Sequence, residues 1–405
     1  DVLDHAKAMP EMSEEEIAQR VLRELRDSVQ VRKVSDVPVG VFLSGGIDSS
    51  TNAALFSEGE NDPIKTFTIG YKGDYKTYRN ESYFAEKMAG IVKSDHHEKL
   101  LTQDDLLDFL PDMVYLQDEP IADPVCVPIY YVSKLARDHG VIVCQVGEGA
   151  DELFWGYPRW KEYLRLEYLN RVPFLGGLKG LGLSAMKLAG MQSSFYYELL
   201  RRGASKETIF WGGAEAFPEG QKKRLISDRL KKKFSNFSSW QAIKPYHDHF
   251  MANAWEPTPL NWMSYLDLKF RLPELLLMRV DKMSMGVSLE GRVPFLDHEF
   301  VTFAMSIPES IKTKNGTLKY ILKKAVNKTI PDELIHRRKQ GFGVPVYEWF
   351  FDRLGDRARS ELNDFCDKTD FLDRNEVMRL FDKKRGSQLW FLLNFAMWWK
   401  RYIEN

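Results

Sequence analysis

The sequence predicts an α/β fold with a parallel sheet in its first 159 residues, followed by a large helical part. Short apolar runs are typical of buried parallel strands, and three of them lie at Val39–Leu43, Ile64–Ile69 and Val141–Val146. Helical patterns separate these runs, and strands that alternate with helices favour parallel pairing. The strand signal fades after Gly156, which indicates a mainly helical remainder.

The other elements follow from local signals. Ser13 and Glu16 have the spacing of a capping box, which predicts a helix over residues 13–29. A polar strand is expected near residues 95–100. Further helices are expected around residues 49–56, 80–89 and 128–137 and from residue 102 onward. The strongly apolar end, residues 389–403, predicts a helix packed into a core.

The charge balance argues against a nucleic-acid partner. Lys and Arg number 57 and Asp and Glu number 58, so the net charge is −1, whereas nucleic-acid binders usually carry a basic excess. Cys126, Cys144 and Cys366 form no CxxC pair, which favours a reducing compartment and predicts a cytoplasmic protein. No signal peptide is predicted, because residues 1–30 are highly charged.

Residues 172–191 come nearest to the composition of a membrane span. They include Lys179 and Lys187 and several glycines. We therefore expect a loop and an amphipathic helix there, without stable membrane insertion. Contact with a membrane surface is the less favoured alternative.

A glycine-rich loop, SGGIDSS at residues 44–50, stands directly after the first predicted strand and before a predicted helix. Glycines let the backbone turn tightly, and the free N–H groups at a helix start attract anions, so the loop predicts a phosphate site. Asp48 cannot bind phosphate directly, because like charges repel, and is expected to hold Mg²⁺ against phosphate oxygens. The loop has neither the Walker A pattern nor GxGxxG. The alternative is a β–α turn without a ligand.

A second glycine turn, GEGADE, follows the strand expected at residues 141–146. Open α/β sheets bind ligands at the carboxyl ends of their strands, so both turns are expected at one edge. Three carboxylates beside a phosphate loop indicate a metal or a cationic intermediate; they are Glu148, Asp151 and Glu152. The alternative is the acidic start of an ordinary helix.

Four motifs stand in one order along the chain: SGGIDSS, VGEGADELFWGY, LLLMRVDKMSMGVSLEGRVPFLD and RRKQGFGVP. Together they resemble the synthetase domain of class B, glutamine-dependent asparagine synthetases, which belong to the ATP pyrophosphatase (PP-loop) superfamily. The resemblance covers residues 15–400 and implies a parallel-sheet PP-loop core. It also implies a reaction in which a carboxylate, most favourably that of aspartate, attacks the α-phosphate of ATP. Ammonia then converts the acyl-adenylate to an amide and AMP.

The resemblance implies a binding site for ATP and Mg²⁺. Asp48 and Asp151 are implied to bind Mg²⁺. Backbone groups of Leu43 and Ile69 are implied to contact adenine, and Gly147 to let the nucleotide pass closely. The residues implied to hold pyrophosphate are Ser44, Gly45, Gly46 and Ser49.

The resemblance also implies two catalytic residues. Glu148 would accept a proton from the ammonium nitrogen or orient it. Lys339 would offset the negative charge that grows on the α-phosphate, although a solvated basic run is the alternative for it. Arg292 either grips a substrate carboxylate or supports the structure by pairing with its neighbours. The residues implied for the substrate are Arg292, Asp281 and Glu290, with Arg279 and Lys319 as weaker candidates.

We expect one synthetase domain overall, made of three parts. Residues 1–34 are a linker and an N-terminal helix, residues 35–159 are the nucleotide-binding core, and residues 160–405 complete the site. Family members carry an N-terminal glutaminase domain. Three possibilities are open for this chain: the domain was removed, it sits on a separate chain, or it is not needed because free ammonia is used. The expected partners are a small carboxylate, ammonia and a glutaminase domain or subunit. A homodimer is a further possibility.

Two alternative functions remain at this point. The acceptor is another carboxylate, such as a uronic acid sugar of a surface polysaccharide or a natural-product acid, or the chain is a non-catalytic nucleotide-binding subunit. The acceptor pocket is expected from residues 115–130 and from the helical region at residues 160–275.

Overall fold

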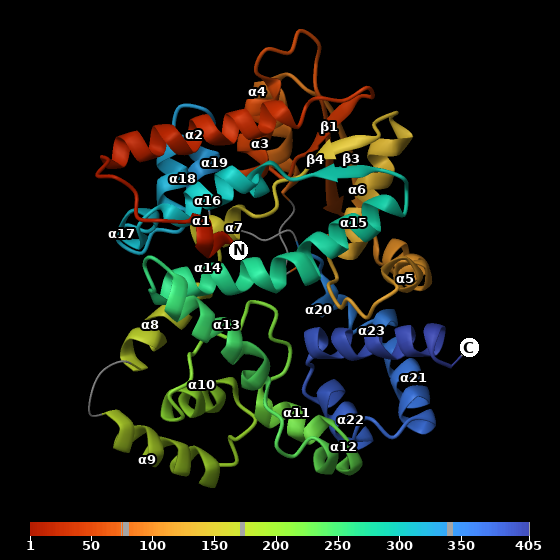
Figure 1. The fold of residues 1–405 in the computed structure, drawn as a ribbon. Helices are drawn as coiled ribbons and strands as arrows, with labels where there is room; N and C mark the ends of the chain where they lie inside the picture. Colours follow the sequence, from red (N-terminus) through yellow and green to blue (C-terminus); the bar gives the residue numbers. More distant parts are fainter. Residues whose placement is uncertain (74, 76–80, 171–174, 338–342, 405) are drawn as a thin grey trace. The chain divides into compact units, whose positions relative to one another are not determined.

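A five-stranded sheet lies in one of the two units into which the chain packs (Figure 1). The structure is a computed structural model and describes residues 1–73, 75, 81–170, 175–337 and 343–404. The sheet unit comprises Asp1–Tyr157, Ala254–Glu256 and Leu272–Glu348. The helical unit comprises Pro158–Asn253, Pro257–Arg271 and Trp349–Asn405.

All strands of the sheet run parallel, in the order β3-β2-β1-β4-β5. Val41 pairs with Thr66 on one side and with Gln145 on the other. Val41 and Phe67 are fully buried, which explains why these strands read as apolar runs. The predicted parallel α/β fold is thereby confirmed. The strands are β1 (Val39–Phe42), β2 (Lys65–Tyr71), β3 (Asp95–Leu101), β4 (Val143–Gln145) and β5 (Glu290–Arg292).

Helices cover both faces of the sheet. α3 (Ile47–Ser57) and α4 (Ser82–Val92) carry the chain from β1 to β2 and on to β3, whereas α5 (Gln103–Gln117) and α6 (Cys126–Asp138) lead back to β4. Parallel crossovers are right-handed, so these opposite directions place the two pairs of helices on opposite faces. The direction of winding reverses between β1 and β4. Such a switch point is where open α/β sheets bind ligands, beyond the carboxyl ends of the strands.

The sheet unit also contains the predicted N-terminal helix, α2 (Glu14–Val31). Its capping box is formed, because Ser13 accepts from the Glu16 N–H and the Glu16 carboxylate accepts from the Ser13 N–H. The other helices of this unit are α1 (Val2–His5), α7 (Ala150–Phe154), α15 (Met278–Met285), α16 (His298–Ser306), α17 (Glu309–Lys312), α18 (Tyr320–Ala325) and α19 (Asp332–His336), and α20 (Val346–Trp349) spans the unit boundary.

The strand β5 was not predicted. It has only three residues, it is largely exposed, and it carries Glu290 and Arg292 on either side of a glycine. Neither an apolar run nor an alternation marks such a strand. It extends the sheet because Glu290 N–H donates to the carbonyl of Ile142 at 2.9 Å, and Val146 N–H donates to the carbonyl of Arg292 at 2.7 Å.

The helical unit is built from helices in the described part of the chain. Leu389, Trp390 and Leu393 of its last helix are at most 1% exposed, so the predicted packing of the apolar end is confirmed. No helix in the described ranges has the length and hydropathy needed to cross a membrane. The helices are α8 (Trp160–Asn170), α9 (Leu175–Leu188), α10 (Phe195–Ala204), α11 (Glu219–Leu225), α12 (Asp228–Lys233), α13 (Ser239–Asn253), α14 (Pro259–Lys269), α21 (Arg353–Lys368), α22 (Arg374–Asp382) and α23 (Gly386–Tyr402).

A buried carboxyl on α14 makes the stability of the helical unit depend on pH. Asp267 is fully buried, accepts from the Gly213 N–H at 2.8 Å and lies 3.5 Å from the Arg271 guanidinium. Burial raises the pKa of Asp267 from 3.8 to about 6, against the opposing effect of Arg271. The folded state therefore binds the proton more tightly than the unfolded chain does.

We expect the free energy of unfolding of this unit to fall by up to roughly 3 kcal/mol as the pH rises from 3.8 to about 6, the two pKa values of Asp267 in the unfolded and folded chain. Urea denaturation at several pH values, compared between the parent chain and Asp267→Asn, measures it. The free energy of unfolding of each protein is plotted against pH, and the difference between the two slopes gives the contribution of this carboxyl, since all other groups titrate in both proteins. Identical slopes would contradict the assignment.

Candidate active site

The predicted phosphate loop connects β1 to α3 at the switch point of the sheet. α3 begins after Gly46, which has no side chain to cap the helix. The first-turn N–H groups of α3 therefore have no side-chain cap from residue 46 and stay open to a ligand. The Ser44 and Ser49 hydroxyls lie 3.0 Å apart, and the Ser44 N–H donates to Ser49 Oγ at 3.1 Å. The loop thus gathers backbone donors, two hydroxyls and the positive end of a helix, which suits an anion.

Gly45 is required by the path of this loop. Its φ of +67° lies in the left-handed region, and an added Cβ would come within 2.5 Å of the Phe84 carbonyl carbon. Phe84 belongs to α4, so the loop rests directly on the backbone of that helix. A side chain at Gly45 would push the phosphate loop away from its support.

The second glycine turn packs against the first. An added Cβ on Gly147 would lie 3.2 Å from the Ser49 nitrogen and 3.4 Å from Asp48 Cβ. The two turns, predicted separately at the ends of different strands, therefore lie next to each other at the start of α3.

Asp48 and Asp151 converge on one cation, the ammonium of Lys319. Lys319 Nζ lies 2.6 Å from both carboxylate oxygens of Asp48 and 2.5 Å from Asp151 Oδ1. Lys319 is only 2% exposed. Burial acts to lower its pKa, but the carboxylates of Asp151 and Asp48 outweigh burial, so the pKa is raised above the ordinary value.

The backbone at Lys319 is also held in place. Its φ is +54°, in the left-handed region that non-glycine residues seldom adopt, and it immediately precedes α18. The Lys319 N–H donates to the Phe154 carbonyl at 3.1 Å, at the end of α7. Strained residues of this kind persist where the surroundings fix them, often at functional sites.

The same two carboxylates fit a magnesium ion. Mg²⁺ is usually bound in proteins through one or two carboxylates, with substrate phosphates and waters supplying the other oxygens. Asp48 and Asp151 direct their oxygens at one position, now filled by the lysine ammonium. Within the described ranges, no group of three or more His, Cys, Asp or Glu side chains is arranged to hold a metal alone. A metal here would therefore depend on the nucleotide for further ligands.

Glu148 belongs to a second charged cluster. Its carboxylate accepts from Arg279 Nη2 at 2.9 Å, while Arg279 Nη1 donates to Asp123. Burial acts to lower the pKa of Arg279, and Asp123 and Glu148 reverse that effect, so its pKa is raised. The cluster joins the second glycine turn, α15 and the region predicted to supply the acceptor pocket.

We expect Arg279→Met to lower the free energy of unfolding by about 3 kcal/mol, because Asp123 and Glu148 would be left without their countercharge in a largely buried place. Adding Asp123→Asn and Glu148→Gln is expected to restore part of this loss. Lys282→Met is the matched control on the same helix. Lys282 pairs with Asp118 at the surface, at 2.7 Å, and such pairs contribute at most about 1 kcal/mol. Equal losses in the two methionine variants, measured by urea denaturation, would contradict the buried-cluster interpretation.

Arg337 is a second cation beside the phosphate loop. It pairs with the buried Glu81, its guanidinium lies 4.6 Å from the ring centre of Phe84, and its Nη2 is 3.6 Å from the place of an added Cβ on Gly46. The predicted catalytic Lys339 lies outside the described residues.

The structure separates the remaining candidates. Leu43 directly follows β1 and Ile69 lies within the neighbouring strand β2. Both are buried, at 2% and 3% exposure, and the carbonyl of Leu43 accepts from Thr68. Arg292 instead donates to the backbone carbonyls of Arg32 and Val34, at 3.0 and 2.7 Å, and to Glu290.

Through these contacts Arg292 connects β5 to the segment that follows α2, which is a structural role. Glu290 and Asp281 are exposed side chains. In the described part of the chain, neither Arg292 nor these two acidic residues form an ion pair with the cluster around Lys319 or with the cluster around Arg279.

Three residues of the site carried weak or no signals in the sequence. Lys319 was a weaker candidate because it stands among other lysines in LKYILKK. Asp123 was included only in a range, and Glu81 was not singled out. A buried charge is recognisable only from its partners, which here come from distant parts of the chain.

Comparisons with known proteins show the family of the chain. The asparagine synthase family model matches residues 20–400. The chain is 35% identical over 402 residues to glutamine-hydrolyzing asparagine synthetase 1 of Bacillus subtilis, covering 97% of this chain and 60% of that protein. It is 28% identical over 340 residues to glutamine-hydrolyzing asparagine synthetase 3 of the same organism, covering 78% and 47%.

A fungal relative has a different name. The chain is 26% identical over 376 residues to Amidase chyE of Penicillium rubens, covering 83% of this chain and 54% of that protein. The chain thus spans 60% or less of the length of these three relatives. Because the family model matches nearly its whole length, the chain belongs to the asparagine synthase family.

Proposed function

We propose that this chain catalyses ATP-dependent amide synthesis, converting aspartate, ATP and ammonia to asparagine, AMP and pyrophosphate. The observation that carries the proposal is the convergence of Asp48 and Asp151 on one cation beside the phosphate loop. A loop that only bound a nucleotide would not need two carboxylates there, since they repel phosphate. Family membership supports the same reaction class.

In the first step, a carboxylate oxygen of aspartate attacks the α-phosphorus and the bond to the β-phosphate breaks. The N–H groups at the start of α3 and the hydroxyls of Ser44 and Ser49 are proposed to bind the leaving pyrophosphate, which their position in one loop supports. Mg²⁺ held by Asp48 and Asp151 would supply positive charge against the phosphate oxygens. In the structure, the Lys319 ammonium supplies the positive charge at that position.

In the second step, the nitrogen of ammonia attacks the acyl carbon, and AMP leaves with the electrons of the acyl–oxygen bond. Glu148 is the group proposed to accept the proton that this nitrogen loses. Arg279 acts as a positioning residue, because its guanidinium holds the Glu148 carboxylate at 2.9 Å. Lys339 is proposed to offset charge on the α-phosphate.

The decisive experiment measures pyrophosphate release by this chain with ATP, Mg²⁺ and ammonium, with and without aspartate, and identifies the product by mass. Aspartate-dependent pyrophosphate release together with asparagine would support the proposal. ATP binding without pyrophosphate release under any acceptor would instead identify a nucleotide-binding subunit.

A different carboxylate acceptor is the second candidate. It is favoured by the similarity to a protein named an amidase rather than an asparagine synthetase, which extends over 83% of this chain. The same assay with uronic acids in place of aspartate tests it. Pyrophosphate release with a uronic acid and not with aspartate would decide for this second candidate.

A further inference from the structure

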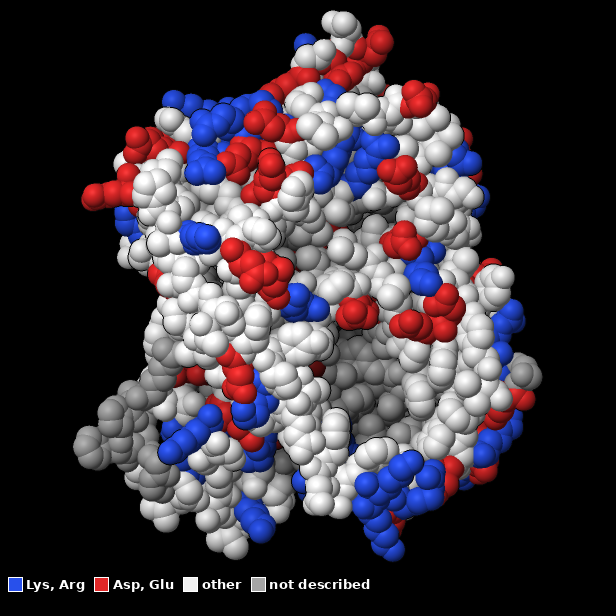
Figure 2. All heavy atoms as spheres, viewed as in Figure 1, with Lys and Arg blue, Asp and Glu red and all other residues white. Residues whose placement is uncertain are grey.

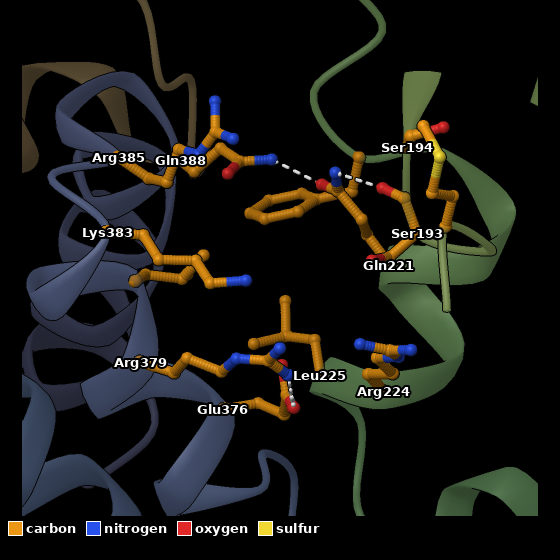
Figure 3. A pocket seen from close by; sticks show the side chains of 13 residues that line it. Ser193, Ser194, Gln221, Arg224, Leu225, Glu376, Arg379, Lys383, Arg385 and Gln388 are labelled. Carbon is orange, nitrogen blue, oxygen red and sulfur yellow. Dashed lines mark hydrogen bonds and ion pairs between the residues drawn. The ribbon is translucent and has the colours of Figure 1, made fainter. Parts of the chain in front are cut away.

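The helical unit contains a cavity of about 180 Å³ that the proposed reaction does not use (Figure 3). One wall comes from the segment between α9 and α10 and from α11, and the other from α22, the turn after it and α23. All of the lining residues belong to the helical unit, whereas the residues of the candidate active site belong to the sheet unit.

The lining is strongly basic. Its charged side chains are Arg224, Arg379, Lys383, Arg385 and Glu376, so four positive charges face one negative charge and the balance is +3. Arg379 binds Glu376 at 2.8 Å. No ion pair joins any of the other three cations to an acidic side chain within the described ranges. Figure 2 shows lysines and arginines gathered over α12 and α22 on the face in view.

The walls of the cavity are held together before any ligand enters. Gln388 donates to Gln221 across the cavity, and Gln221 donates to the Ser193 carbonyl at 2.7 Å. Next to it, the Asp373 N–H donates to the Leu225 carbonyl at 2.7 Å, which fixes α22 against α11. Bringing like charges together in a fixed frame costs free energy, and a bound anion would recover it.

We propose that this cavity binds a small phosphate-type oxyanion, either inorganic phosphate or the phosphate group of a small phosphomonoester. A volume of about 180 Å³ lies below the range of drug-sized pockets, which favours a small anion. A phosphate group carries nearly two negative charges and several acceptor oxygens, which match two or more cationic donors. Lys383 extends into the cavity from one wall and Arg224 lines the opposite wall, and both are assigned as its principal ligands (Figure 3).

The test uses the whole chain without Mg²⁺, with EDTA present, so that metal-dependent binding at the phosphate loop is suppressed. The probes are inorganic phosphate, glycerol 3-phosphate, succinate as a carboxylate dianion, and glycerol. Calorimetry gives affinities, and hydrogen–deuterium exchange locates the protected segments. We expect both phosphate probes to protect residues 217–225 and 376–388. Tighter binding of glycerol 3-phosphate would assign the site to phosphomonoesters and the reverse order to free phosphate, and either order supports the proposal.

Arg224→Gln and Lys383→Gln are each expected to weaken phosphate binding by about tenfold. Lys223→Gln is the matched control, because Lys223 is an exposed lysine next to Arg224 on α11 and does not line the cavity. It is expected to leave the affinity unchanged.

Three results would overturn the proposal. They are equal weakening by Lys223→Gln, protection confined to residues 44–50, and binding of succinate as tight as that of phosphate. The first would indicate general surface charge, the second the phosphate loop, and the third a dicarboxylate site.

Discussion

Asp48→Asn is expected to slow aspartate-dependent pyrophosphate release by about 10³-fold. Asparagine keeps the shape of the side chain but removes one of the two negative charges that converge on the cation position. A metal ion that stabilises transition-state charge contributes several kcal/mol, and each ~1.4 kcal/mol corresponds to a tenfold change in rate. The rate is measured at saturating ATP across a range of Mg²⁺ concentrations.

The control for this variant is Asp62→Asn, which removes the same charge from an exposed position of the sheet unit. It is expected to retain the parent rate. Thermal denaturation of both variants shows whether the sheet unit stays folded, since Lys319 still has Asp151 as a partner in Asp48→Asn. A folded Asp48→Asn protein with the parent rate and the parent Mg²⁺ dependence would rule out the proposed role of Asp48.

Gly156→Ala is expected to have an effect of similar size on activity and, in addition, to destabilise the sheet unit. An added Cβ would lie 1.8 Å from Asp151 Oδ1 and 2.4 Å from Lys319 Cε. Neither distance is possible, so the Asp151 carboxylate and the Lys319 side chain would both have to move away from residue 156. Overpacking of this kind typically costs about 1–3 kcal/mol, and the displaced ion pair adds to it.

Gly90→Ala is the matched control, because an added Cβ there meets nothing within 4 Å and the residue is exposed in the helix α4. It is expected to leave activity unchanged and to stabilise the protein slightly, by about 0.5–1 kcal/mol. Pyrophosphate release and urea denaturation measure both variants. Normal activity in Gly156→Ala would mean that Asp151 and Lys319 do not need their present positions.

The phosphate loop and the acidic turn were predictable because their signals are local. Each follows an apolar strand, contains a glycine turn and precedes a helix, and the parallel sheet brings their ends to one edge. The order of four motifs then identified the family without knowledge of the tertiary contacts. The partner of Asp48 and Asp151 was harder to predict from the sequence. Lys319 is 271 residues from Asp48, and nothing in its own surroundings distinguishes it from nearby lysines.

The charged residues of β5 show the opposite limit. Arg292 stands in a motif that resembles the family closely, yet its guanidinium contacts two backbone carbonyls near the end of α2. A motif indicates that a residue type is required, but it does not distinguish a ligand contact from the support of a strand. The difference depends on where neighbouring segments lie, which a single sequence does not contain. The small basic cavity was missed for the same reason, since its walls come from residues 191–225 and 376–388.

The position of β5 affects how the chain folds during synthesis. β5 pairs with β4 although more than half of the helical unit is made between the two strands and the rest of that unit after them. Until residues 290–292 emerge from the ribosome, β4 is an open edge, and such an edge is prone to pair with other chains. The helical unit likewise waits for residues 349–405. Neither unit can reach its final form early in translation, so nascent chains stay exposed to misassembly until synthesis is nearly complete.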